Sequence, residues 1–225
     1  MEGISLIKKV KIEELYKSIP EGMKPLFEEK TYPWEILPNI KSFVSSLVEN
    51  GIDGYTKHSD GVLIGKNVKI AHNTVIEGPT VIGHNCELRP GAFIRGSVLI
   101  GEGCVIGNST ELKNCILMDN VQVPHYNYIG DSILGHKAHT GAGTVCSNLK
   151  ADNKSVVVHG DDEYETSLRK VGAFLGDFAD VGCNSVLNPG TVVGMNTTVY
   201  PLTSLRGVYP ENCIVKGTKT VVKKR

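Results

Sequence analysis

Large aliphatic side chains recur at every sixth residue, and this constrains the fold more than any other feature. The first run has these members: Ile64, Ile70, Ile76, Ile82, Leu88, Ile94, Ile100, Ile106, Leu112 and Met118. The same step resumes later: Leu175, Val181, Leu187, Val193, Val199 and Leu205. A helix repeats every 3.6 residues and a half-buried strand every two, so neither gives this period. Short strands joined by tight turns in a parallel β-helix do give it, and we expect an all-β solenoid.

The chain length leaves room for one domain with a small appendage. It has 225 residues, of which 25 are glycine and only 6% are aromatic, which suits a repeat of short strands and turns. Apolar spacing over residues 40–48 predicts an amphipathic helix that Gly51 would end. We expect residues 1–58 to form a helical cap over the open end of the solenoid, because terminal repeats need cover. Residues 59–217 would form the β-helix and 218–225 a basic tail.

Two interruptions of the repeat mark where function is expected. The period is lost from Met118 to Asp131, and a charged stretch within residues 155–171 predicts a loop outside the coil. Functional residues collect where a rigid scaffold is interrupted by loops.

Charge and cysteine usage exclude several classes of function. Lys plus Arg and Asp plus Glu both number 24, so no net field attracts nucleic acid or an anionic membrane. The chain has no apolar run long enough to predict a membrane span. Charged residues stand where a signal peptide needs an apolar stretch, so we expect a cytoplasmic protein. The six cysteines lack the C-x-x-C spacing of zinc sites, and we expect buried free thiols.

Two motifs carry a resemblance to a known family. Residues 123–131 (VPHYNYIGD) and 141–148 (GAGTVCSN) resemble the acetyltransferase domain of N-acetylglucosamine-1-phosphate uridyltransferases and related hexapeptide-repeat acyltransferases. The similarity runs from about Ile82 to Gly217. It implies a left-handed β-helix in which three hexapeptides close one coil, so that residues about 18 apart stack. It also implies a homotrimer that transfers acetyl from acetyl-CoA to an amino-sugar 1-phosphate, usually glucosamine 1-phosphate, without a metal.

The resemblance assigns the acid–base residues. An imidazole that titrates near neutrality suits the proton transfer of amine acylation, and His125 occupies the family's catalytic-base position. Glu111 matches a carboxylate near that base, with an orienting or proton-accepting role.

A phosphate needs cations in the same cleft. Lys113, twelve residues before His125, stands at the family's spacing for one of them. Arg89 has the family's local pattern but lies 24 residues before Lys113, whereas Arg95 lies 18 before it and would stack one coil beneath it. We prefer Arg95 and keep Arg89 as the motif-based alternative.

Further positions follow from the same resemblance. Tyr128, Asn148 and Lys154 match substrate-contacting residues. For the acyl-CoA, the resemblance implies contacts at Ala142, whose N–H would meet the thioester carbonyl, and at Asn148, Cys183 and Pro201. The chain departs from many bacterial members at two positions: His139, a substrate-side position, replaces asparagine, and Leu149 replaces tyrosine.

Two other functions fit the same repeat. Residues 1–60 hold no glycine-rich nucleotide-binding opening, so pyrophosphorylase activity is not expected of this chain. A non-catalytic solenoid that assembles with a separate nucleotidyltransferase is the main alternative. A trimeric γ-type carbonic anhydrase would need three histidines at metal distance, and only His136 and His139 of the seven are near neighbours.

Overall fold

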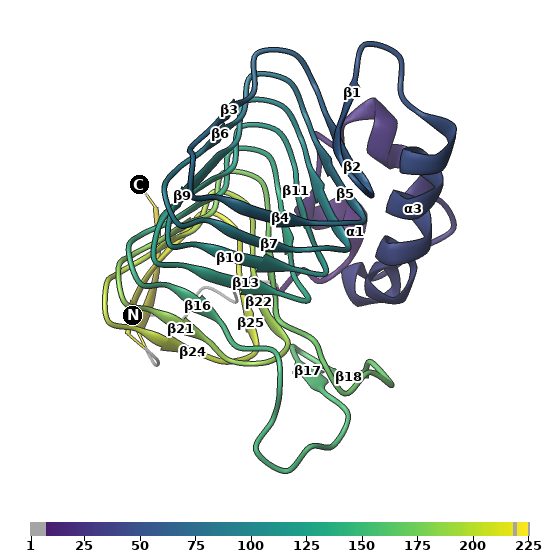
Figure 1. Cartoon of the computed structure of the whole chain (residues 1–225). Helices are drawn as coiled ribbons and strands as arrows, with labels where there is room; N and C mark the ends of the chain where they lie inside the picture. The colour runs from purple at the N-terminus through teal and green to yellow at the C-terminus, as the bar shows by residue number, and fades with distance from the viewer. Residues whose placement is uncertain (1–7, 218–219, 225) are drawn as a thin grey trace.

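The computed structural model describes residues 8–217 and 220–224, and it confirms the left-handed parallel β-helix. Each coil contributes one strand to each of three faces, and strands of successive coils pair in parallel (Figure 1). Face A holds β1 (Thr56–Ser59), β2 (Val62–Ile64), β5 (Thr80–Ile82), β8 (Val98–Ile100), β11 (Cys115–Leu117), β14 (Ile133–Leu134), β19 (Ala173–Leu175), β22 (Thr191–Val193) and β25 (Val208–Tyr209).

The other two faces follow in chain order around each coil. Face B holds β3 (Lys69–Ile70), β6 (Glu87–Leu88), β9 (Val105–Asn108), β12 (Gln122–His125), β15 (His139–Thr140), β20 (Asp180–Val181), β23 (Thr198–Val199), β26 (Cys213–Gly217) and β27 (Thr220–Lys223). Face C holds β4 (Val75–Glu77), β7 (Phe93–Arg95), β10 (Glu111–Lys113), β13 (Tyr128–Gly130), β16 (Val145–Cys146), β21 (Val186–Leu187) and β24 (Ser204–Leu205). We call the two long edges of face C the B–C edge and the C–A edge.

The six-residue ladder forms the interior of the prism. From Ile82 to Leu112 and from Leu175 to Leu205, every predicted position is buried in one continuous core. Burial of these aliphatic side chains is the main force that closes the coils, at about 25 cal/mol for each Å² of apolar surface removed from water.

The expected loss of phase after Met118 is found, but it is a shift of the repeat and not an interruption of the coil. The interior continues through Leu117, Val123 and Ile129, and Met118 instead faces outward into a second apolar cluster. Two steps are five residues long, from Leu112 to Leu117 and from Ile129 to Leu134. Each short step turns at a residue with positive φ, Asn114 or Asp131. The coil is therefore shortened at the C–A edge without being interrupted.

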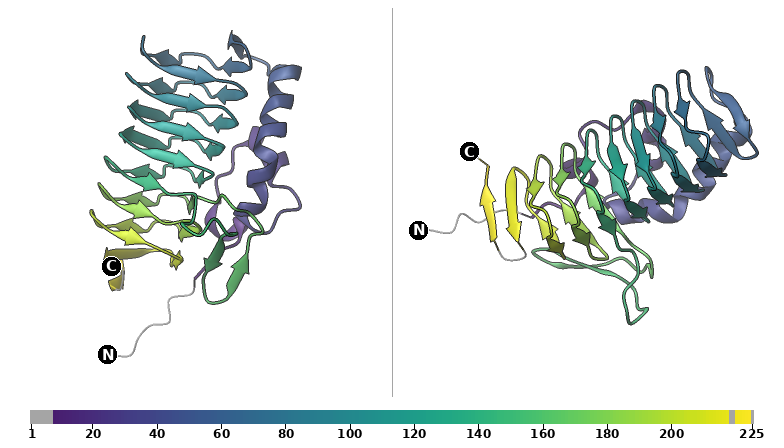
Figure 2. Two further views of the ribbon diagram at one scale, coloured as in Figure 1. Left: turned by 60° about the horizontal axis from the view of Figure 1, so that its bottom comes forward. Right: turned by 60° about the vertical axis from the view of Figure 1, so that its left-hand side comes forward.

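The helical region lies along face A and does not lie across the open end of the solenoid (Figures 1 and 2). It comprises α1 (Ile12–Leu15), the 3-10 helix η1 (Glu21–Met23), α2 (Lys24–Phe27), the 3-10 helix η2 (Pro33–Asn39) and α3 (Ile40–Asn50). Its apolar side chains pack on the outward residues of face A, such as Val81, Leu99 and Phe174. A one-sided stripe on α3 and the outward aliphatic residues of face A thus cover each other.

A buried carboxylate fixes the start of this region. Asp177 accepts hydrogen bonds from the Lys17 and Ser18 N–H groups at 2.8 and 3.0 Å and from the His136 N–H at 2.8 Å. Because the helical region packs on its outward side chains, face A is closed to ligands over most of its length. Faces B and C remain for function.

The segment that leaves the coil forms an antiparallel hairpin of β17 (Val157–His159) and β18 (Glu163–Glu165). Val156 and Val158 pack into the cluster over face A, and Tyr164 lies 5.9 Å from Trp34 between ring centroids. At the carboxyl end, β27 pairs with β26 and Val221 packs against the interior. Part of the predicted basic tail is therefore a strand, while residues 218, 219 and 225 lie outside the described residues.

Candidate active site

The B–C edge aligns the residues expected to serve acyl transfer. His125 ends β12 at this edge. The register of face B places Ala142 one coil further on, and then Cys183 and Pro201, in the same column. Positions far apart in the sequence therefore form one line along the prism, because each coil repeats the same turn.

This column is open to solvent. His125 is exposed, and so is Cys183, whereas the other five cysteines are buried. Among the described residues, the Ala142 N–H has no hydrogen-bond partner. Burial raises the pKa of the Cys146 thiol to about 12, so that interior thiol stays protonated and unreactive. The column thus offers an imidazole and a free backbone donor side by side.

A glycine allows the strand that carries His125 to approach its neighbour. A Cβ added to Gly107 would lie 1.5 Å from the carbonyl oxygen of Pro124. Any larger residue would push the end of β12 outward, and His125 would move with it.

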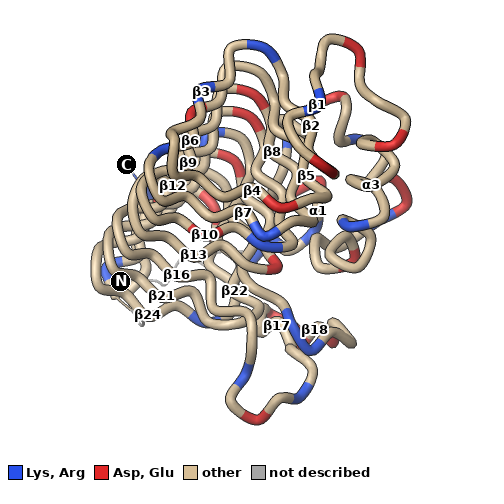
Figure 3. The backbone as a smooth tube through the Cα atoms, viewed as in Figure 1, with Lys and Arg blue, Asp and Glu red and all other residues tan. Residues whose placement is uncertain are grey.

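The C–A edge holds the predicted phosphate cations. Leu112 pairs with Ile94, so Lys113 stacks directly on Arg95, as the count of 18 residues predicts. The Arg95 Nη1 donates to Glu111 Oε1 at 2.7 Å, so the guanidinium folds back over face C toward the B–C edge. Figure 3 shows basic and acidic segments meeting near the ends of β4 and β7.

Arg89 belongs to another face. It follows β6 on face B, where its Nε lies 3.0 Å from Glu87 Oε1. The structure therefore does not bring Arg89 together with Lys113.

Asp131 is the centre of a polar cluster that the sequence analysis missed. Its side chain is only 6% exposed, and its Oδ1 accepts from Asn114 Nδ2 at 2.9 Å. Its Oδ2 accepts from Asn148 Nδ2 and lies 3.4 Å from Lys113 Nζ. A buried carboxylate needs such donors, because removing an unpaired carboxylate from water costs on the order of several kcal/mol. Its place at the second five-residue step was the signal that could have revealed it.

Tyr128 and Asn148 are joined to this cluster. Asn148 Nδ2 also donates to Tyr128 Oη at 3.1 Å. The ring of Tyr128 lies over Gly130, where an added Cβ would be 2.5 Å from Oη. Burial, and secondly the charge of Asp131, raises the pKa of Tyr128, so its hydroxyl remains a donor at neutral pH.

His139 and Lys154 lie apart from both groups in this chain. His139 stacks on Asp180 on face B, with Nδ1 2.7 Å from Oδ1, and this hydrogen bond lowers the pKa of Asp180. Lys154 is exposed on the segment that leads to β17, where its N–H donates to Asp152 Oδ1 at 3.1 Å. Neither residue contacts the Asp131 cluster within the described chain.

The described residues contain no group of three side chains arranged to hold a metal ion. None of the helices within residues 8–217 has the length and hydrophobicity that crossing a bilayer requires.

Comparisons with known proteins agree with the motifs. A family model described as the GMPPB C-terminal domain matches residues 76–164. A protein of Methanococcus maripaludis (strain S2) named Bifunctional protein GlmU is 31% identical over 207 residues, which are 90% of this chain and 50% of the relative. A bifunctional sugar-1-phosphate nucleotidylyltransferase/acetyltransferase of Sulfurisphaera tokodaii is 33% identical over 174 residues, 75% of this chain and 43% of the relative.

The chain spans about half the length of the curated relatives that it matches. The resemblance to their acetyltransferase part is confirmed. Among solved structures, a hexapeptide transferase family protein from Anaplasma phagocytophilum is similar at 17% identity and a TM-score of 0.49, covering 73% of this chain and 81% of the other.

Proposed function

We propose that this chain, a homologue of the acetyltransferase part of those bifunctional proteins, transfers acetyl from acetyl-CoA to the amine of an amino-sugar 1-phosphate. Glucosamine 1-phosphate is the first acceptor to test. The observation that carries the proposal is the register of faces B and C. Face B lines one edge of face C with an imidazole and an N–H that has no partner among the described residues, and face C itself places two stacked cations at its other edge.

The B–C edge would perform the acyl transfer. The acceptor nitrogen attacks the thioester carbonyl, a C–N bond forms, and the nitrogen loses a proton to the ring of His125. The Ala142 N–H donates to the oxygen that becomes negative. The C–S bond then breaks, and the thiolate of CoA takes up a proton. Cys183 and Pro201 continue the column along which the donor would lie.

The C–A edge would bind the phosphate. In a 2-amino-2-deoxy-sugar 1-phosphate such as glucosamine 1-phosphate, the amine and the phosphate are on adjacent carbons, so cations and base must converge over face C. The guanidinium of Arg95 already points that way through its bond to Glu111. A bound phosphate would replace Glu111 on Arg95 and Asp131 on Lys113, and the freed Glu111 carboxylate could then orient His125.

Exposed apolar side chains support a homotrimer with sites between subunits. Tyr126 and Leu202 follow His125 and Pro201 directly, and they are 65% and 79% exposed. Large exposed apolar side chains beside a site indicate a surface that a partner covers. Light scattering at micromolar concentration should give three times the chain mass, and a monomer would count against this assembly.

A thiol-release assay tests the function. Acetyl-CoA is offered with a panel of amino-sugar 1-phosphates, and the N-acetylated form of each sugar serves as the control without a free amine. Release of thiol with the free amine only is the expected result. No release with any acceptor, from a folded and correctly assembled protein, would favour the non-catalytic partner of a separate nucleotidyltransferase.

A further inference from the structure

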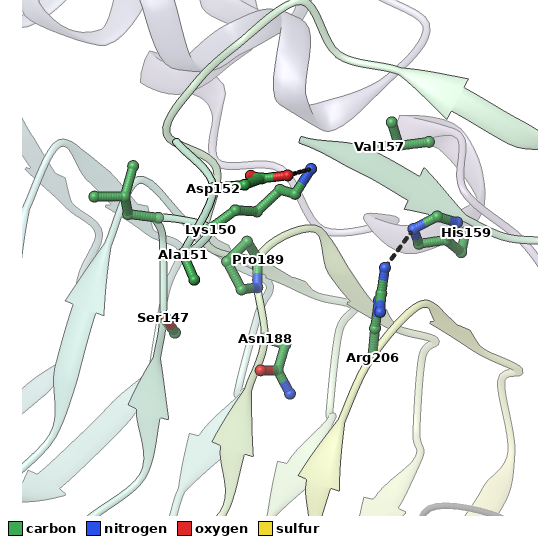
Figure 4. A pocket seen from close by; sticks show the side chains of 10 residues that line it. Ser147, Lys150, Ala151, Asp152, Val157, His159, Asn188, Pro189 and Arg206 are labelled. Carbon is green, nitrogen blue, oxygen red and sulfur yellow. Dashed lines mark hydrogen bonds and ion pairs between the residues drawn. The ribbon is translucent and has the colours of Figure 1, made fainter. Parts of the chain in front are cut away.

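A groove opens between face C and the segment that leads to the β17–β18 hairpin (Figure 4). Its volume is about 600 Å³, within the range of small-molecule sites. We call it the loop groove and define it by Ser147, Leu149, Val157, His159, Pro189 and Arg206. It adjoins the Asp131 cluster through Asn148, which lies between Ser147 and Leu149 in the chain.

Arg206 stands in the same column as the predicted phosphate cations. The register of face C carries the position of Lys113 through Gly130 and Ser147 to Asn188 and Arg206. At about 4.8 Å per coil, Arg206 lies roughly 19 Å beyond Lys113 along the C–A edge. Arg206 is therefore a further cation in the column of Arg95 and Lys113, on the far side of the loop groove.

The guanidinium of Arg206 lies against the ring of a histidine on β17. Its Nη2 lies 3.1 Å from His159 Nε2. The other ring nitrogen of His159, Nδ1, lies 3.3 Å from Glu163 Oε1. Arg206 itself forms no ion pair with a carboxylate among residues 8–217 and 220–224. Arg89 and Arg95, in contrast, each have one.

The remaining groups of the groove fit an organic anion. Lys150 is paired with Asp152 at 3.4 Å, so the charges of these two groups cancel and the positive charge of Arg206 is left over. Leu149, Val157 and Pro189 line the groove with apolar surface, and Leu149 is 39% exposed. A bare inorganic ion would leave this apolar surface in water.

We propose that the loop groove binds an organic phosphate, with Arg206 as the ligand of its phosphate and Leu149, Val157 and Pro189 in contact with its organic body. Two sources share this chemistry. One is the nucleotide of a nucleotide-linked amino sugar, which would then replace the sugar 1-phosphate as the acceptor. The other is the nucleotide part of CoA, whose thioester end would remain at the B–C edge.

Calorimetry with three probes separates these sources. Uridine 5′-diphosphate, CoA and glucosamine 1-phosphate are titrated into the intact protein, into Arg206→Gln, and into Lys41→Gln. The last variant removes one positive charge from the exposed surface of α3. A charged hydrogen bond to phosphate is worth about 1.5–3 kcal/mol, so Arg206→Gln should weaken the bound probe about tenfold to a hundredfold. Lys41→Gln should bind like the unmodified chain.

The probe that loses affinity identifies the source. A loss for uridine diphosphate indicates a nucleotide-linked acceptor, and a loss for CoA indicates the donor. Glucosamine 1-phosphate should bind Arg206→Gln and the unmodified chain equally, because its phosphate is assigned to Arg95 and Lys113, and a loss for this probe alone would overturn the proposal. Equal binding of all probes by Arg206→Gln and the unmodified chain, or no binding of any probe, would overturn the proposal. The measurement involves no acetyl transfer, so it can succeed or fail independently of the proposed activity.

Discussion

The two edges of face C are built from the same repeat yet differ in how their polar residues are held. At the C–A edge, Arg95, Lys113 and Asn148 are engaged by carboxylates, and Asp131 is nearly buried. At the B–C edge, His125 and Cys183 are exposed, and the Ala142 N–H has no hydrogen-bond partner among the described residues. A site that binds an ion benefits from preorganised partners, whereas a base and an oxyanion donor must be accessible to reacting atoms. The contrast suggests binding at one edge and chemistry at the other.

The largest effect should come from the open edge. His125→Ala should lower turnover by about 10² to 10⁴, the usual range for loss of a general base, without changing the thermal midpoint or acetyl-CoA affinity. His58→Ala is the matched control, because His58 is exposed on β1, the outermost strand of face A at the first coil, several coils before His125. Unchanged turnover in His125→Ala would remove the chemical role from this edge.

The closed edge should instead respond in stability. Asp131→Asn replaces an acceptor of three donors by an amide, and we expect a loss of about 2–3 kcal/mol in unfolding free energy. Glu111→Gln removes the same charge from a partly exposed pair and should cost less than about 1 kcal/mol. Denaturant unfolding of both variants checks this difference. Equal losses would mean that burial of Asp131 does not distinguish the two carboxylates.

Loss of a cation from the column of Arg95 and Lys113 should raise the Michaelis constant for the phosphorylated acceptor. Arg95→Ala should raise the KM for an amino-sugar 1-phosphate about tenfold to a hundredfold, because one charged hydrogen bond is lost. The same variant should change little toward the amino sugar without phosphate. Arg89→Ala, on face B, should show no phosphate-dependent defect. If the defect follows Arg89 instead, the local motif was a better guide than the register.

The smallest effect concerns His139, which lies on neither edge. In His139→Ala the pKa of Asp180 should rise toward its ordinary value, because the hydrogen bond that lowers it is gone. A lowered folded-state pKa stabilises the protein above the ordinary pKa, and this contribution is lost as the pH falls through the folded value. Both side chains are about half exposed, at 41% and 53%, so the stability change should stay within about 1 kcal/mol. NMR titration of the Asp180 carboxyl group checks the direction of this shift. A pKa that falls in His139→Ala would contradict the prediction.

The sequence predicted the solenoid because a strict period leaves few alternatives. It also predicted that Arg95 stacks beneath Lys113, since both precede the first shortened coil. It failed at Met118, because a fixed step of six cannot detect a turn that is one residue short. The role of Asp131 depends on that short turn, so it was missed. The packing of the helices on face A was equally hidden, because an amphipathic helix does not specify which apolar surface it will cover.

One measurement tests directly whether the protein transfers the acetyl group of acetyl-CoA to an amine at face C. Acetyl-CoA labelled with ¹³C at the acetyl carbonyl is incubated with glucosamine 1-phosphate, and the product is followed by NMR. We predict a new amide carbonyl resonance that grows as the thioester signal decays, and that is nearly absent with His125→Ala. An ester resonance, or a thioester signal that persists with correctly assembled protein, would contradict N-acetyl transfer at this face.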